Sequence, residues 1–287
     1  MIINASGRCD ICAYYSEWFM NRIREGYVDV MNPFYNEQIK RVSLRKEDID
    51  MIVFCTKNPM PMMKYLDELD EYMTMYQVTL TSYSKDIEVN VPDKKDIIET
   101  IKQLSKRYGS KRVIVRYDPI LLNEKYTKDY HYMMFERLCS QLEGYITTVI
   151  ISFVDYKKNV DANKAVLKLI PISDSDAYEM AEKLAEIGRK HGMTLQTCSE
   201  KYDFTKLGLR NESCISSKVV FELTGKVIGH KKIKGRDYCK CAASTDIGAY
   251  NCCPHFCRYC YANYKEYDVM NNYNIHDVSS TMLLPYK

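Results

Sequence analysis

The chain has 287 residues, which is enough for one large hydrophobic core or two modest ones. Its 46% hydrophobic and 28% charged residues are ordinary for a globular protein, and a net charge of +3 does not by itself indicate nucleic-acid binding. Since there is no long apolar run and no secretory leader after Met1, we expect a cytoplasmic protein with no membrane segment.

Short apolar runs alternate with amphipathic stretches over the first two thirds of the chain. The apolar runs predict strands at residues 2–5, 51–55, 75–80, 112–115, 147–153 and 194–197. The amphipathic stretches predict helices at 14–25, 60–72, 95–108, 128–142 and 176–191. Buried strands separated by helices indicate a parallel sheet, and six such units favour a partial or complete (β/α) barrel of the TIM type. No glycine-rich dinucleotide motif follows a strand, which counts against a Rossmann domain.

The alternation stops after about residue 205. Residues 219–223 suggest one more strand, and the stretch from 225 to 240 is basic, with Lys226, His230, Lys231, Lys232, Lys234 and Arg236. A cysteine-rich segment follows. We therefore expect a barrel over residues 1–205 and a C-terminal extension over 206–287 that packs on the barrel mouth.

Polar side chains follow each predicted strand, at the edge where the chemistry of a parallel barrel gathers. Cationic residues there would bind an anion or a carboxylate, and acidic residues would accept hydrogen bonds or transfer protons. The candidate catalytic residues are Arg8, Asp10, Lys57, Arg116, Asp118, Asp155 and Glu200. Ser6, Thr56 and Asn58 are candidates for binding a cofactor.

Six of the twelve cysteines lie between residues 239 and 260. In a cytoplasmic protein we expect metal ligands or buried thiols rather than disulfides. The spacing Cys253-x3-Cys257-x2-Cys260 predicts three ligands of a [4Fe–4S] cluster, with Tyr259 shielding the cluster from water. Cys241 is the candidate that would close the fourth iron, and Cys239 or Cys252 are the alternatives.

Two further hypotheses concern the same segment. A tetrahedral zinc site on Cys239, Cys241, Cys257 and Cys260 is the alternative to iron. Cys198, at a strand end, is a candidate substrate thiol, hydrogen donor or ligand of a second site. His255 is expected to face solvent.

Five segments together resemble a known family. They are residues 6–11, 56–59, 116–119, 151–155 and the tail from Asp246 to Asn263. The chain is similar to the proteins catalogued as domain of unknown function 1848. The resemblance implies a barrel with a C-terminal iron–sulfur motif and a distant likeness to radical-SAM enzymes such as spore photoproduct lyase. Unlike those enzymes, this chain has its cysteine motif near the C-terminus and no Gly-Gly-Glu segment after the second strand. The residues Thr56, Lys57 and Asn58 would then bind the methionine end of S-adenosylmethionine (SAM).

Three functions follow as expectations. The first is a radical-SAM-like enzyme that takes electrons from a ferredoxin or flavodoxin and acts on a small or nucleotide-like substrate. The second is a redox or hydrolytic enzyme with a fully cysteine-ligated cluster and no SAM. The third is a nucleic-acid-binding protein with a structural cluster or zinc, based on the basic stretch at 225–240.

Overall fold

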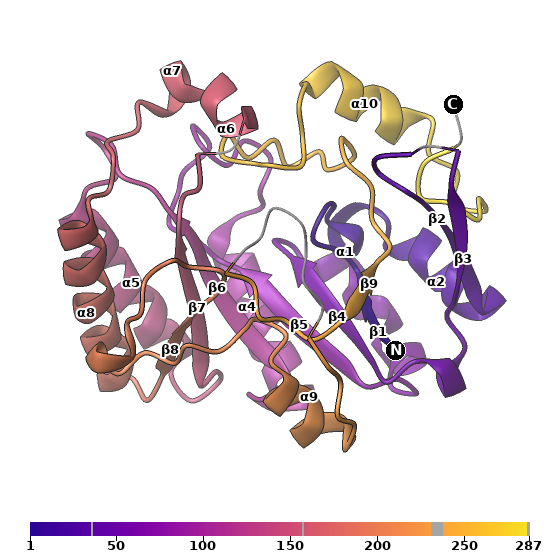
Figure 1. Ribbon diagram of the computed structural model, residues 1–287, viewed down its shortest axis with the longest axis horizontal. Coiled ribbons are helices and arrows are strands. Elements are labelled where there is room, and N and C mark those ends of the chain that lie inside the picture. Colours follow the sequence, from indigo (N-terminus) through magenta and orange to yellow (C-terminus); the bar gives the residue numbers. More distant parts are fainter. Residues whose placement is uncertain (36, 157, 231–237, 286–287) are drawn as a thin grey trace.

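A seven-stranded sheet forms the centre of the protein. The computed structural model describes residues 1–285 apart from residues 36, 157 and 231–237. The strands of this sheet are β1 (Ile2–Asn4), β4 (Met51–Thr56), β5 (Thr74–Thr79), β6 (Val113–Ile120), β7 (Thr148–Phe153), β8 (Thr194–Thr197) and β9 (Ser244–Asp246). Their order is β8-β7-β6-β5-β4-β1-β9, and all neighbours run parallel (Figure 1). A hairpin of β2 (Tyr27–Met31) and β3 (Ile39–Ser43) forms a separate small sheet.

Helices follow most of the strands. The α-helices are α1 (Ile11–Tyr14), α2 (Ser16–Glu25), α3 (Leu66–Leu69), α4 (Lys94–Tyr108), α5 (Lys128–Leu142), α6 (Lys158–Ala162), α7 (Lys164–Leu167), α8 (Asp174–Lys190), α9 (Ser217–Thr224) and α10 (Glu266–Asn274). Short 3-10 turns lie at Lys46–Asp48, Met60–Tyr65 and Thr205–Leu207. The fold is therefore of the α/β class, as the sequence predicts.

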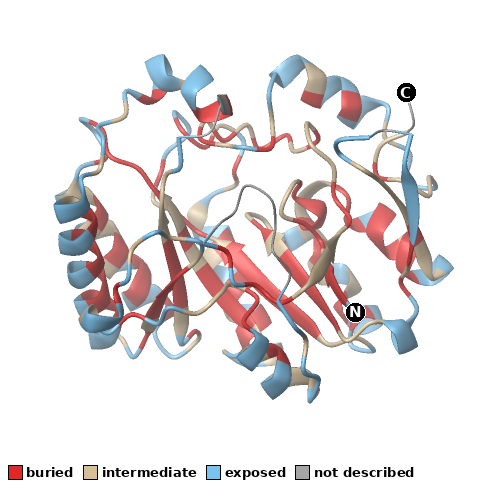
Figure 2. Cartoon of the chain, in the orientation of Figure 1, coloured by how far each residue is buried: buried red, intermediate tan, exposed pale blue. Residues whose placement is uncertain are grey.

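The larger core lies between the sheet and its helices. Side chains alternate between the two faces of a strand, so Phe54, Tyr76 and Val115 point to one face while Val53 and Met75 point to the other. The first face packs against helix residues such as Phe19 and Ile101. Figure 2 shows buried residues along the strands and on the helix sides that face them.

The opposite face, here called the inner face, is covered by the C-terminal part of the chain. It carries Met51, Val53, Met75, Ile114 and Ile150. Residues 208–230, with α9, and residues 238–243 pack their own small apolar cluster on these side chains, formed by Ile215, Val220, Cys239, Cys241 and Ala242. In Figure 1 this orange segment crosses in front of the sheet. Within the described residues the sheet stays open between β8 and β9, so a closed barrel is not formed.

The six strands expected from apolar runs are all present. The expected strand at 219–223 is wrong, because these residues lie within helix α9. The hairpin β2–β3, strand β9 and helix α10 were not predicted. Of the basic stretch, Lys231, Lys232, Lys234 and Arg236 lie outside the described residues.

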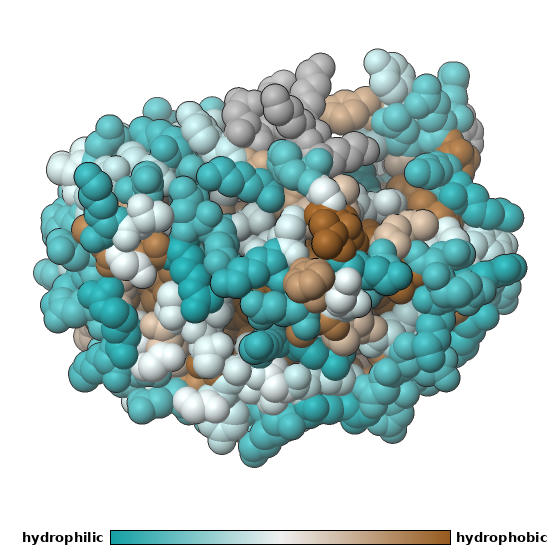
Figure 3. Space-filling model, turned by 60° about the horizontal axis from the view of Figure 1, so that its bottom comes forward, coloured by the Kyte–Doolittle hydropathy of each residue, from teal (hydrophilic) through white to brown (hydrophobic). Residues whose placement is uncertain are grey.

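The surface is mostly hydrophilic on the side that Figure 3 presents, with a small hydrophobic group near its middle. None of the helices that the structure describes is long and apolar enough to cross a membrane.

Candidate metal centre

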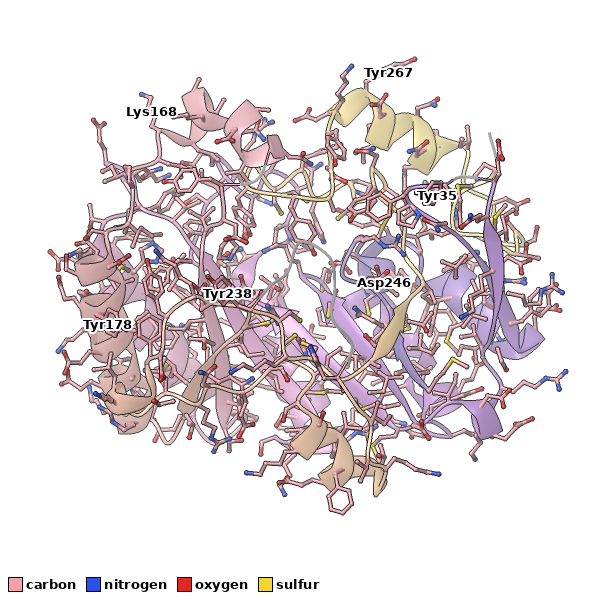
Figure 4. All side chains as sticks on the ribbon, viewed as in Figure 1. Tyr35, Lys168, Tyr178, Tyr238, Asp246 and Tyr267 are labelled. Carbon is pink, nitrogen blue, oxygen red and sulfur yellow. A yellow bond between two sulfur atoms is a disulfide. The ribbon has the colours of Figure 1, made fainter. Side chains whose placement is uncertain are left out.

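The tail of the chain is anchored to the start of the chain by one carboxylate. Strand β9 pairs with β1, and its last residue, Asp246, accepts hydrogen bonds from Ser6 Oγ at 2.8 Å and Gly7 N at 2.8 Å. Arg8 Nε lies 3.1 Å from the same carboxylate. Figure 4 labels Asp246 on β9. Ser6 and Arg8, predicted as cofactor and catalytic residues, are thus engaged in joining the tail to β1.

Beyond β9 the cysteine loop, residues 252–263, passes over the carboxyl ends of β1, β4 and β5. Arg258 N donates to Ile87 O at 2.9 Å, and Asn90 N donates to His255 O at 3.0 Å, which attaches the loop to the connection after β5. On the other side, Asn163 Nδ2 donates to Arg258 O at 2.8 Å. The loop is therefore fixed by polar contacts that do not involve its sulfur atoms.

Asp10 and His255 form a buried pair beneath this loop. Asp10 caps helix α1 by accepting from Ala13 N at 3.0 Å, and it also accepts from Thr56 Oγ1 at 2.6 Å and Lys57 N at 2.7 Å. His255 Nε2 lies 2.9 Å from Oδ2 of Asp10, the oxygen that also accepts from Lys57 N, and His255 is 2% exposed. The expectation that His255 faces solvent is wrong, because the imidazole is needed to fill the hydrogen-bonding capacity of a buried carboxylate.

Glu88 is a second buried carboxylate near the cysteines, and it was not predicted. It lies in the connection after β5 and binds Lys57 Nζ at 2.6 Å, Lys94 Nζ, Tyr259 OH and Thr81 Oγ1 at 2.7 Å. Burial alone would raise the pKa of Glu88, but the two ammonium groups outweigh burial and hold that pKa well below its usual range. Lys57 and Tyr259, both predicted site residues, are therefore held together by Glu88.

The three cysteines of the loop lie in this environment. Burial raises the pKa of Cys257 to about 12, although Lys57 opposes the shift. The thiol of Cys260 accepts a hydrogen bond from Ala262 N at 3.3 Å. Amide donors to sulfur and aromatic cover such as Tyr259 are features of cysteine-ligated clusters. Contrary to the expectation of metal ligands or buried thiols throughout, Cys9 and Cys252 are joined as a disulfide.

A second group of polar residues lies on the inner face of the sheet. Arg116 forms an ion pair with Asp118, with Nε 2.9 Å from the carboxylate, and donates to Gln77 Oε1 at 2.9 Å. Asp118 also accepts from Ser152 Oγ. The guanidinium of Arg116 lies beside the thiols of Cys198 and Cys214. Figure 4 shows sulfur atoms gathered in front of the central strands, between the labelled Tyr238 and Asp246.

A pocket of about 200 Å³ opens next to this group and is lined by Cys198, Glu200, Ser213, Tyr238 and Lys240 among others. Glu200 accepts a hydrogen bond from Phe153 N at 2.8 Å. Burial, together with the nearby carboxylates of Asp155 and Asp118, raises the pKa of Glu200 to about 7. This side chain can therefore exchange a proton near neutral pH.

The predicted site residues thus fall into three places. Asp10, Thr56, Lys57 and Asn58 lie around the cysteine loop, which itself contains Tyr259. Ser6 and Arg8 bind Asp246. Arg116, Asp118 and Glu200 belong to the inner face and its pocket, and Asp155 lies near Glu200. Cys241, predicted as the fourth ligand of the loop cluster, lies with Cys198 and Cys214 instead. Sequence reasoning missed Glu88, Lys94, Gln77 and Asp246, since a single polar residue carries no signal of which distant partner it meets.

Comparison with known proteins gives one family. The model of the family described as "Domain of unknown function (DUF1848)" matches residues 2–262. No curated protein matches the chain. Among solved structures, a candidate α-L-fucosidase of Bacteroides thetaiotaomicron is 12% identical over 72% of this chain and 77% of its own, with a TM-score of 0.23. A similarity at that level supports no inference about fold or activity.

Proposed function

Since the chain belongs to this family of unknown function, we propose its activity from its own side chains. We propose an enzyme that holds a [4Fe–4S] cluster on Cys253, Cys257 and Cys260 and uses it to cleave SAM at the carboxyl ends of β1, β4 and β5.

The residues around the cysteine loop fit such a cluster. Its three thiols come from one short loop, which turns tightly at Phe256, where φ is +51°. The ammonium of Lys57 lies near Cys257 and would offset the negative charge of a thiolate-bound cluster. Two tyrosines add aromatic cover near Cys257. Tyr259, within the loop, donates to Glu88, and the hydroxyl group of Tyr14 contacts Nδ1 of His255. Donor type, charge and shelter from water are therefore all suitable for iron and sulfide.

The observation that carries the proposal is the position of the remaining cysteines. Three of them were candidates for the fourth cysteine ligand of the cluster. Cys241 lies in contact with Cys214, Cys239 interacts with Cys241, and Cys252 is paired with Cys9. Because these candidates are engaged elsewhere, an iron without a cysteine ligand is favoured over a fully cysteine-ligated cluster.

Such a cluster, given one electron by a ferredoxin or flavodoxin, would supply the reductive cleavage of the carbon–sulfur bond of SAM to methionine and a 5′-deoxyadenosyl radical. The protein's own residues would bind and orient the reactants. Thr56 and Asn58 use their side chains within the turn after β4, so we expect backbone groups of this turn to contact SAM. Arg116 would bind an anionic group of the substrate, and Glu200 would move a proton near neutral pH.

The test is spectroscopic and uses the full chain. Protein purified and reconstituted without oxygen should contain about four irons and four sulfides bound through the loop. The electron paramagnetic resonance signal of the reduced cluster should change when SAM is added, and 5′-deoxyadenosine should form. Cys257→Ser should lose the signal, whereas Cys139→Ser, which changes a buried thiol on α5, should keep it.

Two results would contradict the proposal. One is a cluster with four cysteine sulfurs around it, whose signal SAM does not change. The other is iron bound equally well by the wild type and by Cys257→Ser.

A further inference from the structure

Four cysteines outside the cysteine loop gather on the inner face. Cys198 directly follows β8, Cys214 lies before α9, and Cys239 and Cys241 flank Lys240. The sulfur atoms of Cys198, Cys214 and Cys241 all lie within 4.8 Å of one another, and those of Cys214 and Cys241 are 3.2 Å apart. Cys239 interacts with Cys241, and both are buried in the same apolar cluster.

Contacts that do not involve sulfur hold these segments in place. Gln77 Nε2, from β5, donates to Cys214 O at 2.5 Å. His230 Nδ1 lies 3.0 Å from Cys241 O, and Ala242 N donates to Ile215 O at 2.9 Å. These contacts bring the thiols of Cys198, Cys214 and Cys241 together, with Cys239 next to Cys241, as a metal site with fixed ligands requires.

The spacing of the sulfur atoms of Cys198, Cys214 and Cys241 fits a single metal ion. A tetrahedral zinc ion with zinc–sulfur bonds of about 2.3 Å places its four ligands ~3.8 Å apart. The ligands of a cubane cluster bind four different irons and stand further apart. A disulfide would join only one pair of these sulfurs and would not account for the third sulfur, which lies within 4.8 Å of both. Contacts among three sulfurs at once are therefore best explained by one ion.

The charges near the group agree with this explanation. Four thiolates around a divalent cation carry a net charge of −2, which is costly to bury without a cation nearby. Arg116 lies beside Cys198 and Cys214, with its side chain 15% exposed. Lys240 stands between the two last ligands in sequence.

We propose that Cys198, Cys214, Cys239 and Cys241 bind one zinc ion, separate from the cluster of the cysteine loop. The ion joins the end of β8 to the segment that crosses the inner face. It thereby attaches residues 208–230 and 238–243 to the sheet, which in the described part of the chain is open between β8 and β9. A zinc ion with four thiolate ligands has no open coordination position and no redox chemistry, so its role here is to stabilise the fold. This inference does not depend on SAM cleavage.

The experiment measures metals in the full chain. Wild-type protein should contain one zinc ion per chain that survives dialysis against a chelator. Cobalt in place of zinc should give the absorption bands of tetrahedral cobalt thiolate. Each single variant of a zinc ligand should lose zinc to the chelator at least tenfold faster than the wild type. These variants are Cys198→Ser, Cys214→Ser, Cys239→Ser and Cys241→Ser.

Two control variants separate this site from the proposed cluster. Cys257→Ser should lose iron and keep zinc, and Cys139→Ser should keep both metals. If a variant of the zinc ligands fails to fold, wild-type protein titrated with an organomercurial should release zinc as four thiols react. Absence of zinc in the wild type, a second iron–sulfur cluster in its place, or full zinc retention by Cys214→Ser would overturn the assignment.

Discussion

At the scale of single residues, the site depends on buried charges that are fully paired. Glu88 is 1% exposed and lies between Lys57 and Lys94, whose side chains are 12% and 29% exposed. Taking three charged groups out of water is costly, and only their mutual attraction and hydrogen bonds offset that cost. Removing the one negative charge leaves two cations close together without a partner.

We therefore predict that Glu88→Gln lowers the free energy of unfolding by about 3–5 kcal/mol. The measurement is unfolding by urea, followed by fluorescence of Trp18, which is buried beside the sheet. Glu68→Gln is the matched control, because Glu68 pairs with Arg24 at a surface where the two side chains are 45% and 47% exposed. That change should cost less than ~1 kcal/mol. If the two changes lowered the free energy of unfolding equally, Glu88 and its two lysines would not be a coupled unit.

The sequence could predict which nearby residues of the site act together, but not which distant residues meet. Cys253, Cys257 and Cys260 share one loop, so their spacing alone indicated that they act together. Spacing does not say which distant cysteines meet, and Cys241 lies with Cys198 and Cys214 because β8 and the crossing segment are neighbours in space. Asp10 and His255, 245 residues apart, could not be paired from the sequence for the same reason.

At the scale of elements, strong local patterns were predictable and weak ones were not. The run MIVFCT of β4 is buried along almost its whole length, so its apolar composition identified it. Strand β9 consists of Ser-Thr-Asp and is a strand only because β1 offers it a free edge. Residues 219–223 contain two valines and a phenylalanine that suggest a strand, but α9 has an apolar side against the sheet and ends at Gly225, where φ is +68°.

The attachment of β9 gives a prediction at this scale. Asp246 accepts hydrogen bonds from Ser6, Gly7 and Gly248 and pairs with Arg8, so it fixes a strand that has only three residues. Asp246→Asn loses the charge, and its NH₂ group cannot accept from the amide of Gly7. We expect a loss of roughly 1–3 kcal/mol in the free energy of unfolding and faster tryptic cleavage of the tail.

Asp29→Asn is the control for this prediction. Asp29 also pairs with an arginine, Arg41, but within the hairpin β2–β3, and the Arg41 side chain is 63% exposed. The Asp29→Asn variant should show the same rate of tryptic cleavage at residues 240–258 as the wild type. Cleavage that is equally fast in Asp246→Asn and in the wild type would mean that the β1–β9 pairing does not need the carboxylate.

At the scale of the whole molecule, the C-terminal part of the chain packs against the strands and loops of the N-terminal part. This part of the chain crosses the inner face of the sheet, adds β9 beside β1 and then passes over the carboxyl ends of the strands. Much of this path has little regular secondary structure, so few backbone hydrogen bonds within elements support it. Metal ions at its two cysteine groups would add the missing stabilisation, because the free energy of metal binding is also free energy of folding.

The last prediction follows from that arrangement and rests on both proposed metal sites. In hydrogen–deuterium exchange, Cys214→Ser should speed exchange in residues 209–216 and 239–242, and Cys257→Ser should speed exchange in residues 252–263. The amides of α5 and α8 should be unaffected in both variants, because these helices pack on each other at the other face of the sheet. Faster exchange throughout the chain would mean that the metals support the whole fold rather than its tail. Unchanged exchange in both tail segments would mean that the backbone contacts suffice without metal.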